Sequence, residues 1–370
     1  MSTALRILLV NGSLFGGGAE HVIATLARHL RETGHQVTIA VVHDGGEVLG
    51  ELKNEGFGVV TTGGARGGTA SNLQRAVVER GVQLVHSHDL RSLIDAGIGR
   101  LRARRHAHMH TFHFGNYPMV PWKPLLMEGL AARVPDQLVA VGSAQRTSIV
   151  KALRLAEARI RTIWNGVDYV GRPDWAGIER HPQVPRIGSV STFGAQKGLP
   201  TLLQAAKIVH DRGLAFTLVL VGEGPLRREI EGLAADLGLA DRVEFTGWQP
   251  DAAATLLPTF DIFVQSSHWE AMSVVILEAM AARRPIVATA VGENAAVLTH
   301  EESGILVPAK DAAALAEGLA RVIQDVSLRA RLADKAYASY LSRFTGRAMA
   351  DRYAAAYREC LATRGLGSVR

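Results

Sequence analysis

The sequence predicts an α/β protein made of two doubly wound domains, each with a parallel sheet that carries helices on both faces. Short runs of β-branched and aliphatic residues alternate with helical patterns along nearly the whole chain, which is typical of parallel sheets. The alternation is interrupted once, by a stretch rich in Pro and Gly, so we interpret residues 171–185 as a linker. The length of 370 residues also favours two domains, because one domain takes roughly 100–200 residues.

The predicted elements follow in chain order. In the first half the buried strands are RILLV, QVTIAVV, VQLVHSH and DQLVAVG. After the first of these, EHVIATLARHLRETG has apolar residues at helical spacing and stops at Gly34. In the second half the strands are RIGSV, FTLVLVG, VEFTG, FDIFVQS and PIVATA, and helical patterns end the chain.

Composition limits the class of protein. No apolar run approaches the roughly 20 residues that cross a bilayer, and MSTALRILLVNGS is better explained as a first strand than as a signal peptide. The single cysteine, Cys360, excludes an internal disulfide. We therefore expect a soluble cytoplasmic protein.

The excess positive charge lies in the first half. Residues 1–170 hold 19 Lys and Arg against 13 Asp and Glu, a net of +6, whereas residues 171–370 hold 22 of each kind. Much of the excess is in RLRARRHAHMH at 100–110. Such a patch favours an anionic partner, with nucleic acid the weakest candidate because no recognition motif accompanies it. The alternative is a solvated helix end.

Two loops of the first half follow predicted strands, where ligands of open parallel sheets bind. NGSLFGGGAEH opens the first helix, and its glycine amides could approach an anion, although a plain turn is the alternative. HTFHFGNYP presents His110 and His113. Because no cysteine or HExxH arrangement accompanies these histidines, we predict a polar contact from one of them to a substrate and no metal cofactor.

Two stretches of the second half suit a nucleotide. Lys197, in STFGAQKGLP, can neutralise phosphate oxygens, or it is a plain surface lysine. In HWEAMSVVILEAMAARRPIVAT, Ser273 can cap a helix that begins near Val274, whose free amides would bind a diphosphate. Glu278, one turn deeper, could accept ribose hydroxyls, while Glu270 could reach the sugar. The alternative is a buried salt bridge from Glu278 to Arg283 or Arg284.

These motifs resemble the family 4 glycosyltransferases over nearly the full length. Glu270 and Glu278 stand in the family's signature before PIVAT, and FGGGAE, NGVD, KGLPTLLQA, LVGEGPLRREIE, FTGW and SGILVPAKD are also similar. The resemblance implies a GT-B fold, with Rossmann-like domains at 1–170 and 181–345 facing each other across a cleft. A C-terminal helix at about 347–370 would pack back on the first domain. The family is retaining and uses a nucleotide-sugar without a metal.

The resemblance also implies roles. Glu278 should hold the donor ribose, Glu270 the transferred sugar, and Lys197 the diphosphate. His113, in the family's Thr-Phe-His position, should hydrogen-bond the donor sugar near the reacting carbon, so that His113, Lys197 and Glu270 form the expected catalytic set. The other expected donor contacts are Thr192, Met272, Ser273, Val274, Gly17 and Gly18.

Several positions depart from the family pattern, among them Ser266-Ser267, which replaces the usual Pro-Ser at the preceding strand end. Thr192 replaces a customary Arg, so Lys197 should carry more of the phosphate charge. Ala271 replaces the Gly that usually follows the first signature Glu, and Gly292-Glu293 replaces a glycine pair. These changes could retune donor choice or lower activity.

The predicted function is retaining transfer of a sugar from a UDP- or GDP-type donor to a hydroxyl of a glycan or lipid-linked acceptor, in bacterial cell-surface polysaccharide or glycolipid synthesis. The alternatives are a GT-B nucleotide-sugar epimerase and a non-catalytic nucleotide-sugar-binding relative. The chain has no Asp-x-Asp triplet, which disfavours the metal-dependent glycosyltransferase architecture. It also lacks the glycine fingerprint of an NAD oxidoreductase.

The acceptor is expected on the first domain, which carries the excess positive charge. The apolar stretch NYPMVPWKPLLMEGL follows the basic residues. We expect this region to meet an anionic acceptor or the inner face of the cytoplasmic membrane, whereas the alternative is packing beneath the second domain. The residues of this expected surface are Arg102, Arg104, Arg105, Tyr117 and Trp122.

Overall fold

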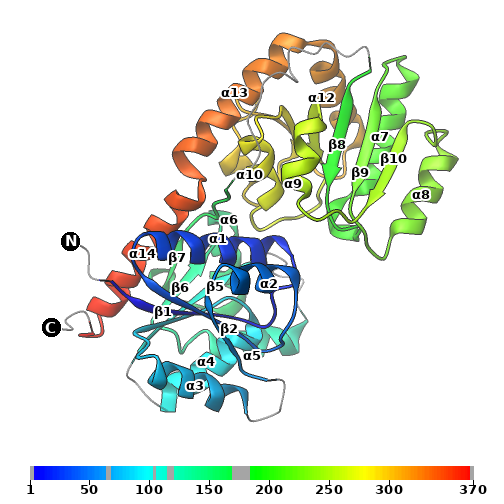
Figure 1. The fold of residues 1–370 in the computed structure, drawn as a ribbon. Helices are drawn as coiled ribbons and strands as arrows, with labels where there is room; N and C mark the ends of the chain where they lie inside the picture. The colour runs from blue at the N-terminus through cyan, green and yellow to red at the C-terminus, as the bar shows by residue number, and fades with distance from the viewer. Residues whose placement is uncertain (1–3, 64–67, 103–105, 115–120, 169–183, 367–370) are drawn as a thin grey trace. The chain divides into compact units, whose positions relative to one another are not determined.

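The structure is a computed structural model that describes residues 4–63, 68–102, 106–114, 121–168 and 184–366. Nearly all of the predicted linker, together with Arg104, Arg105 and Tyr117, lies outside these ranges. The chain divides into two compact units, Met1–Gly166 with Gly346–Arg370 and Val167–Thr345. We call them unit 1 and unit 2 and describe each by itself (Figure 1).

Unit 1 contains a parallel sheet of seven strands in the order β3-β2-β1-β4-β5-β6-β7. Parallel neighbours need crossover connections, and helices supply most of them. The strands are β1 Arg6–Asn11, β2 Gln36–Val41, β3 Gly58–Thr61, β4 Leu84–Ser87, β5 Ala107–Phe112, β6 Gln137–Ala140 and β7 Ile160–Thr162. The helices are α1 Gly18–Glu32, α2 Glu47–Asn54, α3 Thr69–Glu79, α4 Leu90–Arg102, α5 Trp122–Ala131, α6 Ser143–Leu153 and α14 Gly346–Ala362.

Unit 2 contains a six-stranded sheet in the order β10-β9-β8-β11-β12-β13, again with parallel pairings. Its core gathers the aliphatic side chains of β8, β9 and β11 with the apolar faces of α7 and α12. The strands are β8 Arg186–Val190, β9 Thr217–Val221, β10 Val243–Gly247, β11 Ile262–Gln265, β12 Ile286–Thr289 and β13 Ile305–Val307. The helices are α7 Leu199–Asp211, α8 Arg227–Asp236, α9 Ala252–Thr255, α10 Val274–Ala281, α11 Asn294–Val297, α12 Ala312–Gln324 and α13 Val326–Arg343.

The predicted fold class is confirmed, since both sheets are parallel and doubly wound. The position of His110 is different from the prediction: it lies inside β5 and is buried, not in the following loop. The strand AHMHTF alternates histidines with other residues. It therefore lacks the run of aliphatic residues that predicts the neighbouring strands.

The chain order reverses beside the first strand of each sheet. β1 lies between β2 and β4, and β8 lies between β9 and β11. In sheets of this kind the crevice at the carboxyl ends of such strands is the usual ligand site. The loops after β1, β4, β8 and β11 therefore define where a functional site is built.

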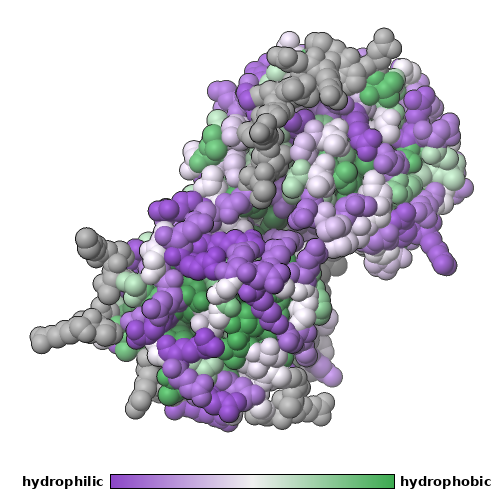
Figure 2. Space-filling view, viewed as in Figure 1, coloured by the Kyte–Doolittle hydropathy of each residue, from purple (hydrophilic) through white to green (hydrophobic). Residues whose placement is uncertain are grey.

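The face of the molecule seen in Figure 2 is mostly hydrophilic, with groups of hydrophobic residues among the hydrophilic ones. Among the helices that the structure describes, none combines the length and the apolar character needed to cross a bilayer.

Candidate functional site

An ion pair joins the two loops at the switch point of unit 2. The Lys197 Nζ lies 2.6 Å from the Glu270 Oε1, and both side chains are largely withdrawn from solvent, at 19% and 7% exposure. Ser267 Oγ donates a second hydrogen bond to the same oxygen at 2.8 Å. Gln196 Nε2 approaches the other carboxylate oxygen at 3.4 Å. Glu270 is thus held by three donors, which stabilise its charge in a largely buried position.

The backbone around Lys197 is tied to the strand end opposite it. Ser266 Oγ donates to the Lys197 carbonyl at 2.9 Å, and the His268 amide donates to the Gln196 carbonyl at 2.7 Å. Gly198 has φ +60°, and a Cβ there would stand 2.2 Å from the Ser266 carbonyl oxygen. Only glycine fits this close approach, so the Lys-Gly sequence is what lets the two loops meet.

A second glycine supports the loop that carries Glu270. Gly292 has φ +52°, and a Cβ at this position would lie 2.0 Å from the Glu270 carbonyl oxygen. The next residue, Glu293, donates its amide to the Ala271 carbonyl at 3.1 Å. The first glycine of the family's pair is therefore the one that the packing requires. Ala271 is not among the described residues with positive φ, so an alanine there is unstrained.

The helix α10 begins where the sequence predicted, with Ser273 as its N-cap. Ser273 Oγ accepts from the Ile276 amide at 3.4 Å and also from Gln265 Nε2 at 2.6 Å. Asn294 Nδ2 donates to Gln265 Oε1 at 2.8 Å, which fixes the orientation of the Gln265 amide. The positive end of the α10 dipole, flanked by Met272 and Val274, thus lies on the same loop as Glu270.

Glu278 lies in the second turn of α10 and its carboxylate has no hydrogen-bond or ion-pair partner among the described residues. Burial raises the pKa of Glu278 to about 7. The alternative of a salt bridge is wrong: Arg283 bonds to Asp334, and Arg284 donates to the carbonyls of Phe260 and Ala282. A half-buried carboxylate without a partner is costly, and such groups are typical of ligand sites.

Thr192 follows β8 and is exposed, with its carbonyl accepting from the Gly194 amide at 2.9 Å. It lies on the same loop as Lys197, but its side chain is too short to supply the charge of the arginine usual at this position. Among the described residues of this loop and the loop after β11, Lys197 is the one Lys or Arg whose charged group contacts Glu270.

In unit 1, His113 lies just after β5, beside the end of β4. Its Nε2 is 2.9 Å from Nδ1 of His88, and the two rings stack with centroids 5.2 Å apart. Burial lowers the pKa of His113 to about 4, so the ring is neutral at pH 7. No group of three or more His, Cys, Asp or Glu side chains in the described ranges is arranged to hold a metal ion.

The glycine loop after β1 is already occupied by a carboxylate. Glu20 Oε2 accepts from the amides of Gly16 and Gly17, at 2.5 and 2.9 Å, so that its side chain bonds back to the N-cap residue of α1. An anionic ligand would have to displace Glu20 to reach the Gly17 amide, while Gly18 begins the helix itself. Glu20 is a residue that the sequence analysis did not consider, although the Gly-Gly-Gly-Ala-Glu spacing is a capping signal.

The residues of the basic segment at 100–110 that the structure describes do not form one continuous patch. Arg100 is buried and pairs with Asp136 at 3.1 Å. The three histidines that follow are buried and neutral because burial lowers their pKa. Among the expected surface residues that the structure describes, Arg102 is exposed at the end of α4 and Trp122 is 69% exposed at the start of α5. Three more apolar residues of α5 are exposed, namely Leu126, Met127 and Leu130.

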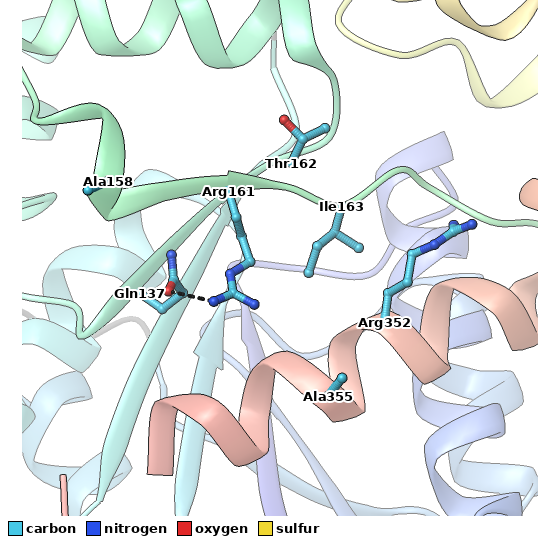
Figure 3. Close-up of a pocket in the computed structure, with 7 residues that line it drawn as sticks. All are labelled: Gln137, Ala158, Arg161, Thr162, Ile163, Arg352 and Ala355. Carbon is cyan, nitrogen blue, oxygen red and sulfur yellow. Dashed lines mark hydrogen bonds between the residues drawn. The ribbon is translucent and has the colours of Figure 1, made fainter. Parts of the chain in front are cut away.

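A cavity of about 410 Å³ opens in unit 1 beside β7 and α14 (Figure 3). It contains none of the predicted site residues; its lining is Gln137, Ala158, Arg161, Thr162, Ile163, Arg352 and Ala355. Arg161 points into it but donates to Gln137 at 3.2 Å and pairs with Glu359 at 2.7 Å. Its charge is therefore largely offset, and the candidate site remains at the strand ends.

Two doubly wound units with parallel sheets are the arrangement of GT-B glycosyltransferases. The sequence profile described as glycosyl transferases group 1 matches residues 174–339. The profile of glycosyltransferase family 4 matches residues 16–169. The chain belongs to this family of glycosyltransferases, and the family predicted from the motifs is confirmed.

Characterised relatives are similar over part of their length. A lipopolysaccharide core biosynthesis glycosyltransferase of Rhizobium meliloti is 32% identical over 57% of this chain and 60% of its own. An α-D-kanosaminyltransferase of Streptomyces kanamyceticus is 31% identical over 50% of this chain and 47% of its own. The chain thus spans about half the length of these two relatives. A UDP-Gal-dependent α-1,3-galactosyltransferase of Escherichia coli is 25% identical over 69% of this chain and 70% of its own.

Solved structures share the fold. HepE of Anabaena, in complex with UDP-glucose, superposes with a TM-score of 0.84 at 20% identity over 96% of this chain and 100% of its own. Sucrose-phosphate synthase of Thermosynechococcus elongatus superposes with a TM-score of 0.81 at 21% identity, over 97% of this chain and 100% of its own. At these identities the likeness shows the fold alone.

Proposed function

We propose that the chain transfers a sugar, with retention, from a nucleoside diphosphate sugar to a hydroxyl of a glycan or lipid-linked acceptor. The observation that carries this proposal is the unpartnered carboxylate of Glu278, one turn inside α10, on the segment that also carries Glu270, the partner of Lys197. A ribose offers two adjacent hydroxyl donors, which match a carboxylate with unused acceptor capacity.

A uridine nucleotide is the proposed donor carrier. HepE, which shares the fold, was solved with UDP and with UDP-glucose, and the relative from Escherichia coli is named for UDP-Gal. In the proposed complex the diphosphate lies at the N-terminus of α10, near Met272, Ser273 and Val274, with Thr192 at its edge. The free amides of the first helical turn favour that position.

The proposed chemistry is stabilisation of the leaving group. The departing diphosphate gains charge in an oxocarbenium-like transition state, and the Lys197 ammonium with the α10 amides would stabilise that charge. Glu270, which already accepts from Lys197 and Ser267, orients the lysine and offers its remaining lone pairs to sugar hydroxyls. In a retaining reaction on one face of the sugar, a departing phosphate oxygen takes the acceptor proton.

The acceptor is proposed to bind unit 1, and the enzyme to work at the inner face of the cytoplasmic membrane. Relatives are named for lipopolysaccharide core synthesis and for a diphosphoundecaprenol acceptor. Trp122, Leu126 and Leu130 recur at helical spacing on α5 and are exposed, with Lys123 beside the Trp122 ring. An exposed apolar stripe next to cations is suited to an anionic lipid surface. Sedimentation with anionic vesicles that is unchanged by Trp122→Ser and Leu126→Ser would contradict this location.

A thermal-shift screen of nucleotide-sugars tests the proposed donor. A ligand at a hundredfold over its Kd stabilises the folded protein by about 2.7 kcal/mol, and we expect UDP-sugars to give the largest shift. Turnover is then followed with candidate acceptors. Epimer formation without an acceptor would instead identify an epimerase, and a shift without any turnover would identify a binding protein. If no nucleotide-sugar shifts the melting temperature, the proposed function fails.

A further inference from the structure

One nitrogen of the His113 ring is engaged and the other is not. His113 Nε2 lies 2.9 Å from His88 Nδ1, whereas His113 Nδ1 is buried and has no hydrogen-bond partner. The mirror situation holds for His88, whose Nε2 is also buried and without a partner. Two histidines thus share one hydrogen bond, and each has one unused ring nitrogen.

Both rings are neutral, which fixes the number of protons. Burial lowers the pKa of His88 well below its usual value, and burial lowers that of His113 to about 4. A neutral imidazole carries one N–H and one nitrogen lone pair. The hydrogen bond between the two rings therefore holds a single proton, donated by one ring and accepted by the other. The tautomer of one histidine therefore determines the tautomer of the other.

The unequal exposure of the two residues favours one of the two arrangements. If His113 Nε2 held the shared proton, His88 would carry its own N–H on the unpartnered Nε2, in a residue only 3% exposed. A buried donor without an acceptor costs free energy. If His88 Nδ1 holds the shared proton, the unmatched N–H falls instead on Nδ1 of His113. That nitrogen is also buried, but His113 as a residue is partly exposed after β5, so a ligand that binds beside it can supply the acceptor oxygen.

His88 itself is held firmly. Its amide donates to the Val10 carbonyl at 3.1 Å and lies 3.1 Å from Ser92 Oγ. Its ring centroid is 4.0 Å from that of His86, whose two nitrogens bond to Tyr357 and Thr111 at 2.7 and 2.8 Å. The imidazole of His88 therefore has little freedom to turn away from His113.

We propose that His88 is a positioning residue that holds His113 in the tautomer protonated at Nδ1, so that His113 is a hydrogen-bond donor toward the sugar. This inference rests on the proposed function in that it assumes a ligand oxygen beside His113. A donor at this position suits the hydroxyl and phosphate oxygens of a nucleotide-sugar. The same site with an unprotonated Nδ1 could accept only from hydroxyl groups.

The tautomer can be read without any activity, by long-range 1H–15N correlation spectra of the histidine rings. The His113 signals are assigned by their loss in His113→Asn. In the unsubstituted protein we expect Nδ1 of His113 to be the protonated nitrogen. In His88→Phe the partner of Nε2 is gone, and we expect the proton to redistribute toward Nε2, the form preferred by free histidine.

Activity gives the second readout. His88→Phe should lower kcat by roughly 10- to 100-fold, the scale of losing one oriented contact, with the KM for the donor changed much less. His88→Asn, whose amide can donate near the former Nδ1 position, should recover part of kcat. His108→Asn is the matched control, because His108 is equally buried but bonds to Ser87 and not to His113.

The outcomes separate this inference from the proposed function. An Nε2-protonated His113 in the unsubstituted protein, or unchanged kcat in a folded His88→Phe, would overturn the role of His88. Equal losses of kcat in His88→Phe and His108→Asn would also overturn it, because they indicate a general packing effect. Failure of the proposed function would appear differently, as absence of turnover in the unsubstituted enzyme whatever tautomer the spectra show.

Discussion

Lys197 and Glu270, 73 positions apart in the chain, meet at 2.6 Å because β8 and β11 are neighbours in the sheet of unit 2. The lysine follows one strand and the glutamate follows the other. Since both strands run in the same direction, their carboxyl ends coincide, and the two loops can exchange side-chain contacts.

Breaking this pair should affect stability as well as turnover. Lys197→Ala leaves the 7% exposed Glu270 carboxylate without its cation, and we expect a loss of about 1–3 kcal/mol of unfolding free energy. Glu270→Ala should cost a similar amount. The double substitution should cost less than the sum of the two, because it leaves no unmatched charge. Chemical denaturation of the four proteins measures this, and strict additivity would mean that the pair is not coupled.

Glu278→Gln should remove the pH dependence of nucleotide binding. Burial raises the pKa of Glu278 to about 7, and the ionised form is the acceptor of ribose hydroxyls. The apparent affinity for UDP should therefore fall as pH drops below 7, approaching about tenfold per pH unit. The Gln variant should bind weakly at every pH. Calorimetric titration between pH 6 and 8 checks this, and parallel curves for the two proteins would exclude Glu278 from the site.

The same substitution should stabilise the protein without ligand. The pKa of Glu278 is about 7 in the folded protein, above the ordinary 4.5. As pH rises between these two values, the Glu278 carboxyl group therefore loses its proton in the unfolded chain before it does so in the folded protein. Stability is then lost as pH rises through this window. At pH 8 we expect Glu278→Gln to melt at a higher temperature than the unsubstituted protein, whereas near pH 4 the two should be alike. A lower melting temperature at pH 8 would contradict the burial of this carboxylate.

Unit 1 should be sensitive to mild acid. Six of its histidines are buried and a seventh, His113, is half-buried, and desolvation is the main cause that lowers the pKa of each, to about 4 for His106 and His113 and about 3 for His110. Below pH 6.5 the unfolded chain takes up protons that the folded unit does not. Each histidine thus removes up to about 1.4 kcal/mol per pH unit as pH falls. The full set is His35, His86, His88, His106, His108, His110 and His113.

Denaturation curves at pH 7.5, 6 and 5 measure this effect, and limited proteolysis at pH 5 shows which unit opens first. We expect cleavage in residues 1–166 before cleavage in unit 2. An unfolding free energy that stays constant from pH 7.5 to 5 would show that the histidines titrate normally.

Gly292→Ala should perturb the site far more than an equivalent change elsewhere. A Cβ at Gly292 would lie 2.0 Å from the Glu270 carbonyl oxygen, whereas Gly213, also at positive φ, has no atom within 4 Å of such a Cβ. Gly213→Ala should cost about 1 kcal/mol from backbone strain alone. Gly292→Ala should cost more and lower kcat. If Gly292→Ala and Gly213→Ala changed stability and turnover equally, the tight packing behind Glu270 would be contradicted.

Local features of the chain were predictable because they depend on residues close in sequence. The alternation of strand and helix patterns, the Ser273 cap and the start of α10 at Val274 all follow from side chains within a few positions of one another. The placement of Glu278 one turn further follows from helical spacing alone. Even Gly198 could be suspected, since Lys-Gly before Leu-Pro signals a turn into a helix.

The tertiary structure decided what those residues contact. That Glu270 is held by Lys197, and that His88 contacts His113, depends on which strands lie side by side. The burial of Arg100 and of three histidines in the segment 100–110 also depends on tertiary contacts, such as the pair of Arg100 with Asp136. Sequence patterns report the local conformation of the backbone, whereas burial, pairing and pKa arise from neighbours that only the folded sheet brings together.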